Sequence, residues 1–526
     1  MVIYRARMVI SRVSGPSSPR GDTLGVAATR APERLSRGTW LALFAMGLGV
    51  FVIANDFTAL SVAIPKIEQE LHTSLSHAQW VINGYALVFG VLIVTGGRLA
   101  DLLGRKRMFL VGATIFGFFS LLCGLMPTVG PLIACRALMG VGVALMWPAV
   151  LGLTYALLPE DKKGLAGGLI LGVAGLGNTV GPLLGGWLTD AASWRLVFFL
   201  NLPVTAFAML VTQREVKESR AGADPGGRPP GTPRSALRAE AGGAGRGEHG
   251  IGNLDYTGIA LLSAGAVAVL LGLDQASSAG WGSPVILALL CGGVAALAVF
   301  LVAERRLGER ALVPSAVLRN RVFAACCAVV LLMSAIFFAA LLYLPQYMEV
   351  VLHYSAIRSG AGLLPMMGVF AVTSFVAGGL YGRLGPRVAV SAGAALLAIG
   401  IFLLSFLGGS ASYWALVPGM CVLGAGVGLF YSSVTTAAVT ALDPARSSLA
   451  GGIVYMCQIA GGAIGLGLNT AIVLSAATLS EGIRLAFRVD AILAVAGFAV
   501  CATFVHGARS SAAHRAAVPG HHRVRA

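Results

Sequence analysis

The segment GGRLADLLGRKR, residues 96–107, gathers charge in a chain that is otherwise apolar. Four basic residues and one acid, Asp101, fall within ten positions between two long hydrophobic stretches. Basic residues beside a membrane span anchor its loop on the cytoplasmic side. An acid contributes nothing to that anchoring, so Asp101 is a candidate for a specific contact.

Two further charged residues lie inside hydrophobic stretches, Asp56 beside Asn55 and Arg136. A charge at the centre of a bilayer costs about 2.5–3.5 kcal/mol on insertion scales. We therefore expect Asp56 to face a cavity and to bind a proton or a cationic substrate. The alternative is a carboxylate near the outer rim that caps a neighbouring helix. For Arg136, the alternative to a functional role is that it snorkels to the interface.

Other polar residues within or at the ends of hydrophobic stretches are weaker candidates for lining a substrate path. They are Asn55, Asn83, Tyr85, Asn178, Asp274, Gln346, Glu349, Tyr431, Tyr455, Gln458 and Asn469.

The composition indicates the elements that carry these residues. Of 526 residues, 57% are hydrophobic and 11% are charged, whereas a soluble domain has about 25% charged residues. About 20 apolar residues span a bilayer as a helix, and fourteen stretches reach such a length. The predicted spans are 39–64, 79–99, 108–126, 131–157, 164–188, 194–212, 255–273, 284–303, 322–345, 357–379, 388–407, 413–438, 447–474 and 488–507. The fold class is an all-α membrane protein.

The net charge of +16 follows from membrane topology rather than from nucleic-acid binding. An even number of spans places both termini on the same side of the membrane. Of the 38 Lys and Arg residues, 32 then lie on that side, 5 lie on the opposite side, and Arg136 lies inside a span. Basic loops stay in the cytoplasm. We therefore predict both termini to be cytoplasmic, with Lys66, Arg195, Arg358, Arg484 and Arg488 outside.

The polar stretches divide the chain. Segments rich in Gly, Pro and Arg cannot bury a core, so they predict disordered tails and a flexible linker. The predicted organisation is a tail at 1–38, a six-helix bundle at 39–212, a linker at 213–252, two additional helices at 253–305, a six-helix bundle at 320–507 and a tail at 508–526.

A weak internal repeat relates the two predicted bundles. GGLYGRLGPR (378–387) follows span 10 as GRLADLLGRK (97–106) follows span 2. The glycines and one basic position are kept, while Gly382 replaces the acid. Repeats around a site at the membrane midplane are a transporter architecture.

The sequence contains no pattern for catalysis, metal binding or nucleotide binding. All eight cysteines fall within predicted spans without metal-ligand spacing, which favours packing roles. No GxxxxGK[ST] loop or soluble catalytic domain is present. We expect no enzyme activity, cofactor or metal, and expect an ion gradient, most simply of protons, to supply energy.

Several motifs resemble the major facilitator superfamily. GGRLADLLGRKR resembles the family's loop between helices 2 and 3, and RALMGVGVALMWPA (136–149) its helix 4 motif. GVAGLGNTVGPLLGGW (172–187), NDFTALSVAIPKIEQEL (55–71) and SWRLVFFLNLP (193–203) resemble the fourteen-helix drug:proton antiporter branch. The resemblance implies the major facilitator fold, two six-helix bundles plus two extra helices.

The resemblance implies roles for the singled-out residues. Asp101 and Arg105 would latch the bundles on the cytoplasmic side, where Asp443 and Pro444 predict a helix start that attracts a carboxylate. The gating loop comprises Gly97, Asp101, Gly104, Arg105 and Lys106. Arg136 would tune a nearby acid in proton coupling.

The motif of span 5 carries Gly177, Gly181 and Gly185 at every fourth residue, beside Pro182 and Gly186. Small residues at this spacing form a close helix-packing face. The resemblance implies that this face seals the two bundles against leak, and a kink at Pro182 would shape the cavity.

These features predict a proton-coupled exporter of amphipathic small molecules, such as drugs or antibiotics, working by alternating access in the plasma membrane as a monomer. The alternative is a proton-linked importer of a small metabolite, against which the antiporter motif argues. A sensor or enzyme would need a soluble domain.

Overall fold

The computed structural model describes residues 36–159, 162–218, 255–280, 282–307, 311–406 and 412–505. All regular structure in these ranges is helical. Most of the predicted tails and linker, at 1–35, 219–254 and 506–526, lies outside the described residues.

Among the described residues, six long helices precede the linker, and nine α-helices of varied length follow it. The first group is α1 (Arg37–Glu70), α2 (Leu75–Leu103), α3 (Arg105–Leu125), α4 (Val129–Leu157), α5 (Lys163–Ala191) and α6 (Arg195–Glu215). The helices after the linker are α8 (Tyr256–Ala279), α9 (Pro284–Leu307), α10 (Ser315–Leu318), α11 (Arg321–Val350), α12 (Ala356–Ala361), α13 (Leu364–Leu404), α14 (Tyr413–Thr440), α15 (Ser447–Ser475) and α16 (Leu479–Phe504), with a short 3-10 turn, η4 (Pro444–Arg446), before α15.

Thirteen described helical segments are long and apolar enough to cross a membrane, and one of them contains two spans. α13 is 41 residues long and is interrupted at Gly385, which has the left-handed φ of +77° and is followed by Pro386. Its two arms correspond to the predicted spans 357–379 and 388–407, so each of the fourteen predicted spans has a helix.

The last span begins earlier than predicted. α16 starts at Leu479, where the Thr478 side chain accepts a hydrogen bond from the Glu481 amide. Its predicted start at 488 is wrong because Arg484 and Arg488 suggested a loop. Both arginines are instead part of the helix.

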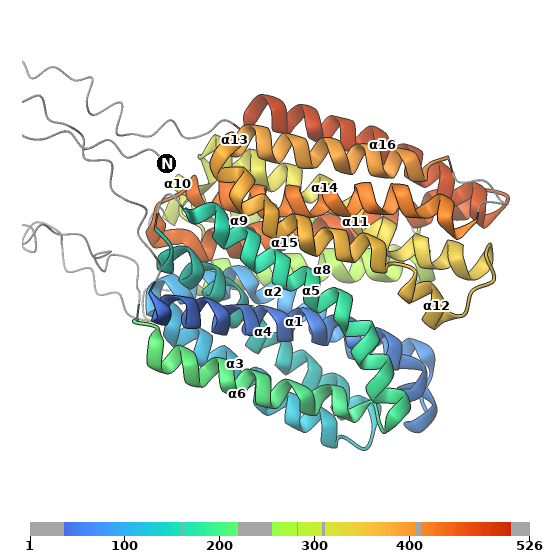
Figure 1. Ribbon diagram of the computed structural model, residues 1–526, viewed down its shortest axis with the longest axis horizontal. Helices are drawn as coiled ribbons and strands as arrows, with labels where there is room; N and C mark the ends of the chain where they lie inside the picture. The colour runs from blue at the N-terminus through green and yellow to red at the C-terminus, as the bar shows by residue number, and fades with distance from the viewer. Residues whose placement is uncertain are drawn as a thin grey trace, which may run out of the picture.

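The helices form two bundles that lie side by side (Figure 1). Helices α1, α3, α4 and α6 occupy the lower part of the view and α13, α14 and α16 the upper part. Helices α8 and α9 pack on each other, and α8 also contacts α2 and α15. The additional pair therefore covers one of the two seams between the bundles.

The bundles meet tightly at one end, which we call the terminal end because α1 starts there and α16 finishes there. The opposite end is called the far end. Along α5, glycines at positions 164, 168, 172 and 175 face α13. A Cβ on Gly168 would lie 2.8 Å from the Ser374 carbonyl oxygen, and one on Gly164 would lie 2.6 Å from that of Gly378. α13 approaches the α5 backbone closely because α5 has no side chain at these positions.

The second seam at the terminal end joins α2 and α4 to the other bundle. A Cβ on Gly97 would lie 2.7 Å from the Ser448 carbonyl oxygen at the start of α15. The Tyr155 hydroxyl on α4 lies 3.0 Å from the Thr436 hydroxyl on α14. Both seams are thus closed at this end.

We predict that Gly168→Leu prevents the terminal end from closing, because overpacking a contact costs about 1–3 kcal/mol. Alkylation of a cysteine placed at the buried Ser432, followed by mass spectrometry of its peptide, should be faster in this variant. Gly379→Leu is the matched control, since a Cβ there meets no described atom within 4 Å. Equal labelling in both variants would contradict the tight glycine contact.

Candidate functional site

A cavity of about 1000 Å³ lies between the two bundles. Its walls come from α1, α2, α4 and α5 on one side and from α11 to α15 on the other. The charged residues that line it, Lys66, Asp190 and Glu349, are exposed at the far end of their helices. The cavity therefore opens at the far end and stops at the closed terminal end.

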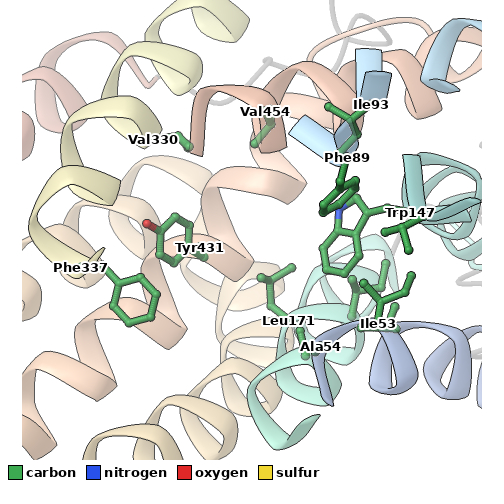
Figure 2. Close-up of a cluster of buried hydrophobic side chains, with 14 of the residues drawn as sticks. Ile53, Ala54, Phe89, Ile93, Trp147, Leu171, Val330, Phe337, Tyr431 and Val454 are labelled. Carbon is green, nitrogen blue, oxygen red and sulfur yellow. The ribbon is translucent and has the colours of Figure 1, made fainter. Parts of the chain in front are cut away.

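The deep part of the cavity is aromatic and apolar. Where α15 meets α2 and α4, the Trp147 and Tyr455 ring centres are 4.5 Å apart, and those of Phe89 and Tyr455 are 5.2 Å apart. On the wall formed by α11 and α14, Phe337 packs edge-on against Tyr431 at 6.0 Å. Figure 2 shows the Trp147–Phe89 group and the Phe337–Tyr431 group facing each other from separate helices.

The wall formed by α2 and α4 carries two hydrogen-bond donors that have no protein partner. The Trp147 Nε1 and the Tyr85 hydroxyl are buried and unpaired, and both residues line the cavity. Aromatic faces with a few polar groups are typical of sites for small organic molecules. The described lining can thus stack a planar molecule and donate hydrogen bonds to its oxygens.

Some residues predicted for a substrate path line the cavity and others do not. Those that line it are Tyr85, Asn178, Glu349, Tyr431, Tyr455 and Gln458. Asn55, Asn83, Gln346 and Asn469 are not part of its wall. For Asn55 the reason is packing, since its backbone lies against Gly177 of α5 and the residue is buried. Hydrophobic stretches do not reveal which face of a helix turns inward.

Asp56 and Arg136 form a fully buried ion pair behind the cavity wall. An Arg136 Nη lies 2.6 Å from Asp56 Oδ2, and Arg136 Nε donates to the Val81 carbonyl oxygen at 2.9 Å. Both side chains have zero exposure. The snorkelling alternative for Arg136 is therefore wrong. The expectation that Asp56 faces the cavity is also wrong, because its charge is compensated inside the bundle.

The pair has two further neighbours. Asn201 on α6 donates from Nδ2 to Asp56 Oδ1 at 2.9 Å, and the Arg136 guanidinium lies 4.1 Å from the centre of the Tyr85 ring. Tyr85 touches the cavity as well, so one aromatic ring connects the ion pair to the cavity. Sequence reasoning missed Asn201, although a polar residue inside the predicted span 194–212 was a usable signal.

Asp101 joins the two bundles at the terminal end. Its carboxylate accepts hydrogen bonds from the Ser448 and Leu449 amides at 3.3 and 2.9 Å, in the first turn of α15. Arg105 donates to the same carboxylate at 2.9 and 3.0 Å and to the Pro444 carbonyl oxygen at 2.6 Å. Asp443, predicted to cap the helix of span 13, caps the 3-10 turn η4 just before α15, and its side chain accepts a hydrogen bond from the Ala445 amide. The helix N-terminus favours a carboxylate.

Of the other residues in the predicted gating loop, Gly97 touches α15 of the opposite bundle, whereas Gly104 and Lys106 act within their own bundle. Gly104 separates α2 from α3 with a φ of +114°, which glycine adopts readily. Lys106 donates from Nζ to the Gln213 carbonyl oxygen at 2.8 Å, and its amide donates to Glu218 at 3.1 Å. Lys106 therefore ties α3 to the end of α6 and is not part of the contact between bundles. Glu218, at the start of the predicted linker, caps α3.

The glycine motif of α5 also faces a different partner from the one expected. Gly177, Gly181 and Gly185 pack against α1 of their own bundle, where a Cβ on Gly177 would lie 2.9 Å from the Phe51 carbonyl oxygen. The glycines that face the other bundle lie earlier in α5, at 164–175, and were missed. Pro182 and Gly186 line the cavity.

Two helix bundles around a cavity that is open at one end and closed at the other define a membrane transporter of the alternating-access class. The chain belongs to the Major Facilitator Superfamily, whose family model matches residues 46–466 and 366–524. The predicted fold class is thereby confirmed. The structure is also similar to that of the human organic anion transporter MFSD10 (TETRAN), with a TM-score of 0.60, 13% identity and coverage of 88% of this chain and 99% of that chain.

Curated relatives of similar length include resistance and export proteins. The chain is 32% identical to the tetracenomycin C resistance and export protein of Streptomyces glaucescens, over 84% of this chain and 77% of that protein. It is 32% identical to the puromycin resistance protein pur8 of Streptomyces alboniger, over 86% and 84%. It is 31% identical to the multidrug resistance protein Stp of Mycobacterium tuberculosis, over 82% and 75%.

We predict that Asp56 and Arg136 depend on each other for stability. Removing one partner of a buried ion pair costs about 3–5 kcal/mol because the other charge is left unpaired. Asp56→Asn and Arg136→Gln should each lower the unfolding temperature in detergent, and the double variant should recover much of the loss. Additive losses in the double variant would show that the two charges do not interact.

We predict that Asp101→Asn lowers transport strongly while membrane insertion stays normal. The α15 amides and Arg105 all donate hydrogen bonds to the Asp101 carboxylate. The NH2 group of an asparagine side chain cannot accept them, so part of the contact between the bundles is lost. Lys106→Gln is the control, because Lys106 contacts only its own bundle, and its transport should stay near the wild-type rate. Wild-type transport by well-inserted Asp101→Asn would rule out a role for this contact.

Proposed function

We propose that this protein exports aromatic or other apolar small molecules from the cell in exchange for protons. The observation that carries the proposal is the cavity between the bundles, with an uncharged aromatic interior among the described lining residues and charges only at its rim. The named substrates of several relatives support it, since those proteins confer resistance to or export antibiotics.

The transport cycle follows from the two ends of the cavity. In the described conformation the terminal end is held by Asp101, Arg105 and the glycine contacts of α5, so a substrate leaves at the far end. Opening of the terminal end breaks these contacts together and exposes the same aromatic walls to the other side. Asp101 and Arg105 act here as a latch, because their hydrogen bonds exist only while the bundles touch.

Proton coupling is assigned to Asp56 and Arg136. A proton that reaches Asp56 neutralises the carboxylate and frees Arg136 from its partner, which changes the surroundings of Tyr85 at the cavity wall. Loss of the proton restores the pair. A substrate on the aromatic wall and a proton on Asp56 therefore act on the same side chain, which is the differential interaction that coupling requires. The proton gradient supplies the energy without a cofactor.

The orientation of the chain completes the proposal. The strong excess of Lys and Arg in the loops at the terminal end supports a cytoplasmic location for that end and for both termini. The cavity then faces outward in this conformation. One chain contains the whole cavity, so the protein acts as a monomer. It works in the plasma membrane as a transporter rather than as an enzyme.

Inverted membrane vesicles with an acidified interior test the proposed function. A panel of planar aromatic drugs should cause proton release in wild-type vesicles. Release should be lost in Asp56→Asn and should weaken in Trp147→Ala, because Trp147 forms the aromatic wall. Proton release that persists in Asp56→Asn would place the coupling elsewhere, and drug movement down the proton gradient would support the importer alternative.

A further inference from the structure

Another buried carboxylate, Asp490 on α16, lies in the bundle opposite Asp56 and differs from Asp56 in its partners. Asp490 has no exposed surface, and it accepts one hydrogen bond, from Asn469 Nδ2 on α15 at 3.1 Å. The same Asn469 Nδ2 donates to the Gly465 carbonyl oxygen at 2.9 Å. Among the described residues, no Lys, Arg or His forms an ion pair with Asp490.

The helices packed against α16 supply no compensating charge. α11 contributes the neutral Tyr343, whose hydroxyl lies 2.7 Å from that of Thr470 on α15. The charged or titratable residues of α13 are Tyr381, Arg383 and Arg387, near its interruption at Gly385. On α16 itself, Glu481, Arg484 and Arg488 lie closer to its far-end start, and neither arginine is within ion-pair distance of Asp490.

Two acceptor oxygens in this contact lack a donor. Asp490 Oδ2 and Asn469 Oδ1 are both buried and unpaired. An ionised carboxylate buried without a counter-charge costs several kcal/mol, and a buried unpaired acceptor costs about 1–3 kcal/mol. A proton on Asp490 Oδ2 removes the charge and supplies a donor that can reach toward the Asn469 carbonyl oxygen. The protonated acid and the amide then complement each other as donor and acceptor.

We infer that Asp490 is a proton-binding site of the C-terminal bundle, separate from the Asp56–Arg136 pair, and that it holds a proton in the conformation open at the far end. Its link to transport is α15, which carries Asn469 and, one turn earlier, the cavity residue Leu466. A shift of α15 relative to α16 within this bundle, when the cavity changes sides, separates Asn469 from Asp490 and releases the proton. The role in transport rests on the proposed function, but proton binding does not.

Infrared spectroscopy of the purified protein tests proton binding directly. A protonated carboxylic acid has a carbonyl band separate from the bands of a carboxylate. The spectrum of Asp490→Asn should lose an acid band that the wild type and Asp56→Asn retain at neutral pH. Asn keeps the hydrogen bond to Asn469 and has nearly the shape of the protonated acid, so we expect folding to persist. Glu481→Gln, at the exposed start of the same helix, is the control. An unchanged acid band in Asp490→Asn would overturn the assignment.

Proton release in vesicles tests the role in transport. Asp490→Asn should bind aromatic drugs as the wild type does but release fewer protons for each drug transported. An unchanged ratio would show that the proton stays on Asp490 throughout the cycle and would overturn its part in coupling. Absence of drug-dependent release in the wild type would contradict the proposed function, while the infrared result would still decide whether Asp490 binds a proton.

Discussion

The hydrogen bonds between Asp101 and the first turn of α15 join the two bundles at the closed terminal end, and we propose that this conformation depends on them. The carboxylate accepts hydrogen bonds from two backbone amides of the opposite bundle and from Arg105. Arg105 also donates a hydrogen bond to the Pro444 carbonyl oxygen. A carboxylate at a helix N-terminus contributes up to about 2 kcal/mol in a partly buried setting. We propose that this contact and the glycine contacts of α5 together keep the terminal end closed while the cavity is open at the other end.

Three buried carboxylates show three ways of placing a negative charge in a membrane protein. Asp101 is stabilised by a helix end and a neighbouring arginine across the bundle interface. Asp56 is neutralised within its bundle by Arg136. Asp490 has one amide neighbour and an unpaired oxygen, so protonation is the remaining way to remove its charge. We propose that these differences place bundle contact, proton coupling and proton storage at separate sites in the molecule.

The sequence predicted the fold well because hydrophobic length, basic loops and glycine-rich motifs act locally. The fourteen spans and the cap at Asp443 depend on residues within a few turns of each other. The contact of Asp101 with α15 links residues 347 positions apart, and only the family resemblance implied it. Partners across the bundle are harder to predict. Arg136 contacts Asp56 across a sequence separation of 80. Which face of α5 meets α1 or α13 depends on the rotation of the helix, and its glycines lie on both of these faces. Asp490 was missed because its span was predicted to begin only two residues before it.

The most direct test of this account is the distance between the bundles at the terminal end, measured by pulsed electron resonance. Spin labels at Arg107 on α3 and Leu384 on α13, both exposed, report on the two bundles. We predict one short, narrow distance distribution in the wild type and a longer, broader one in Asp101→Asn. Identical distributions in the two proteins would contradict the claim that Asp101 holds the bundles together.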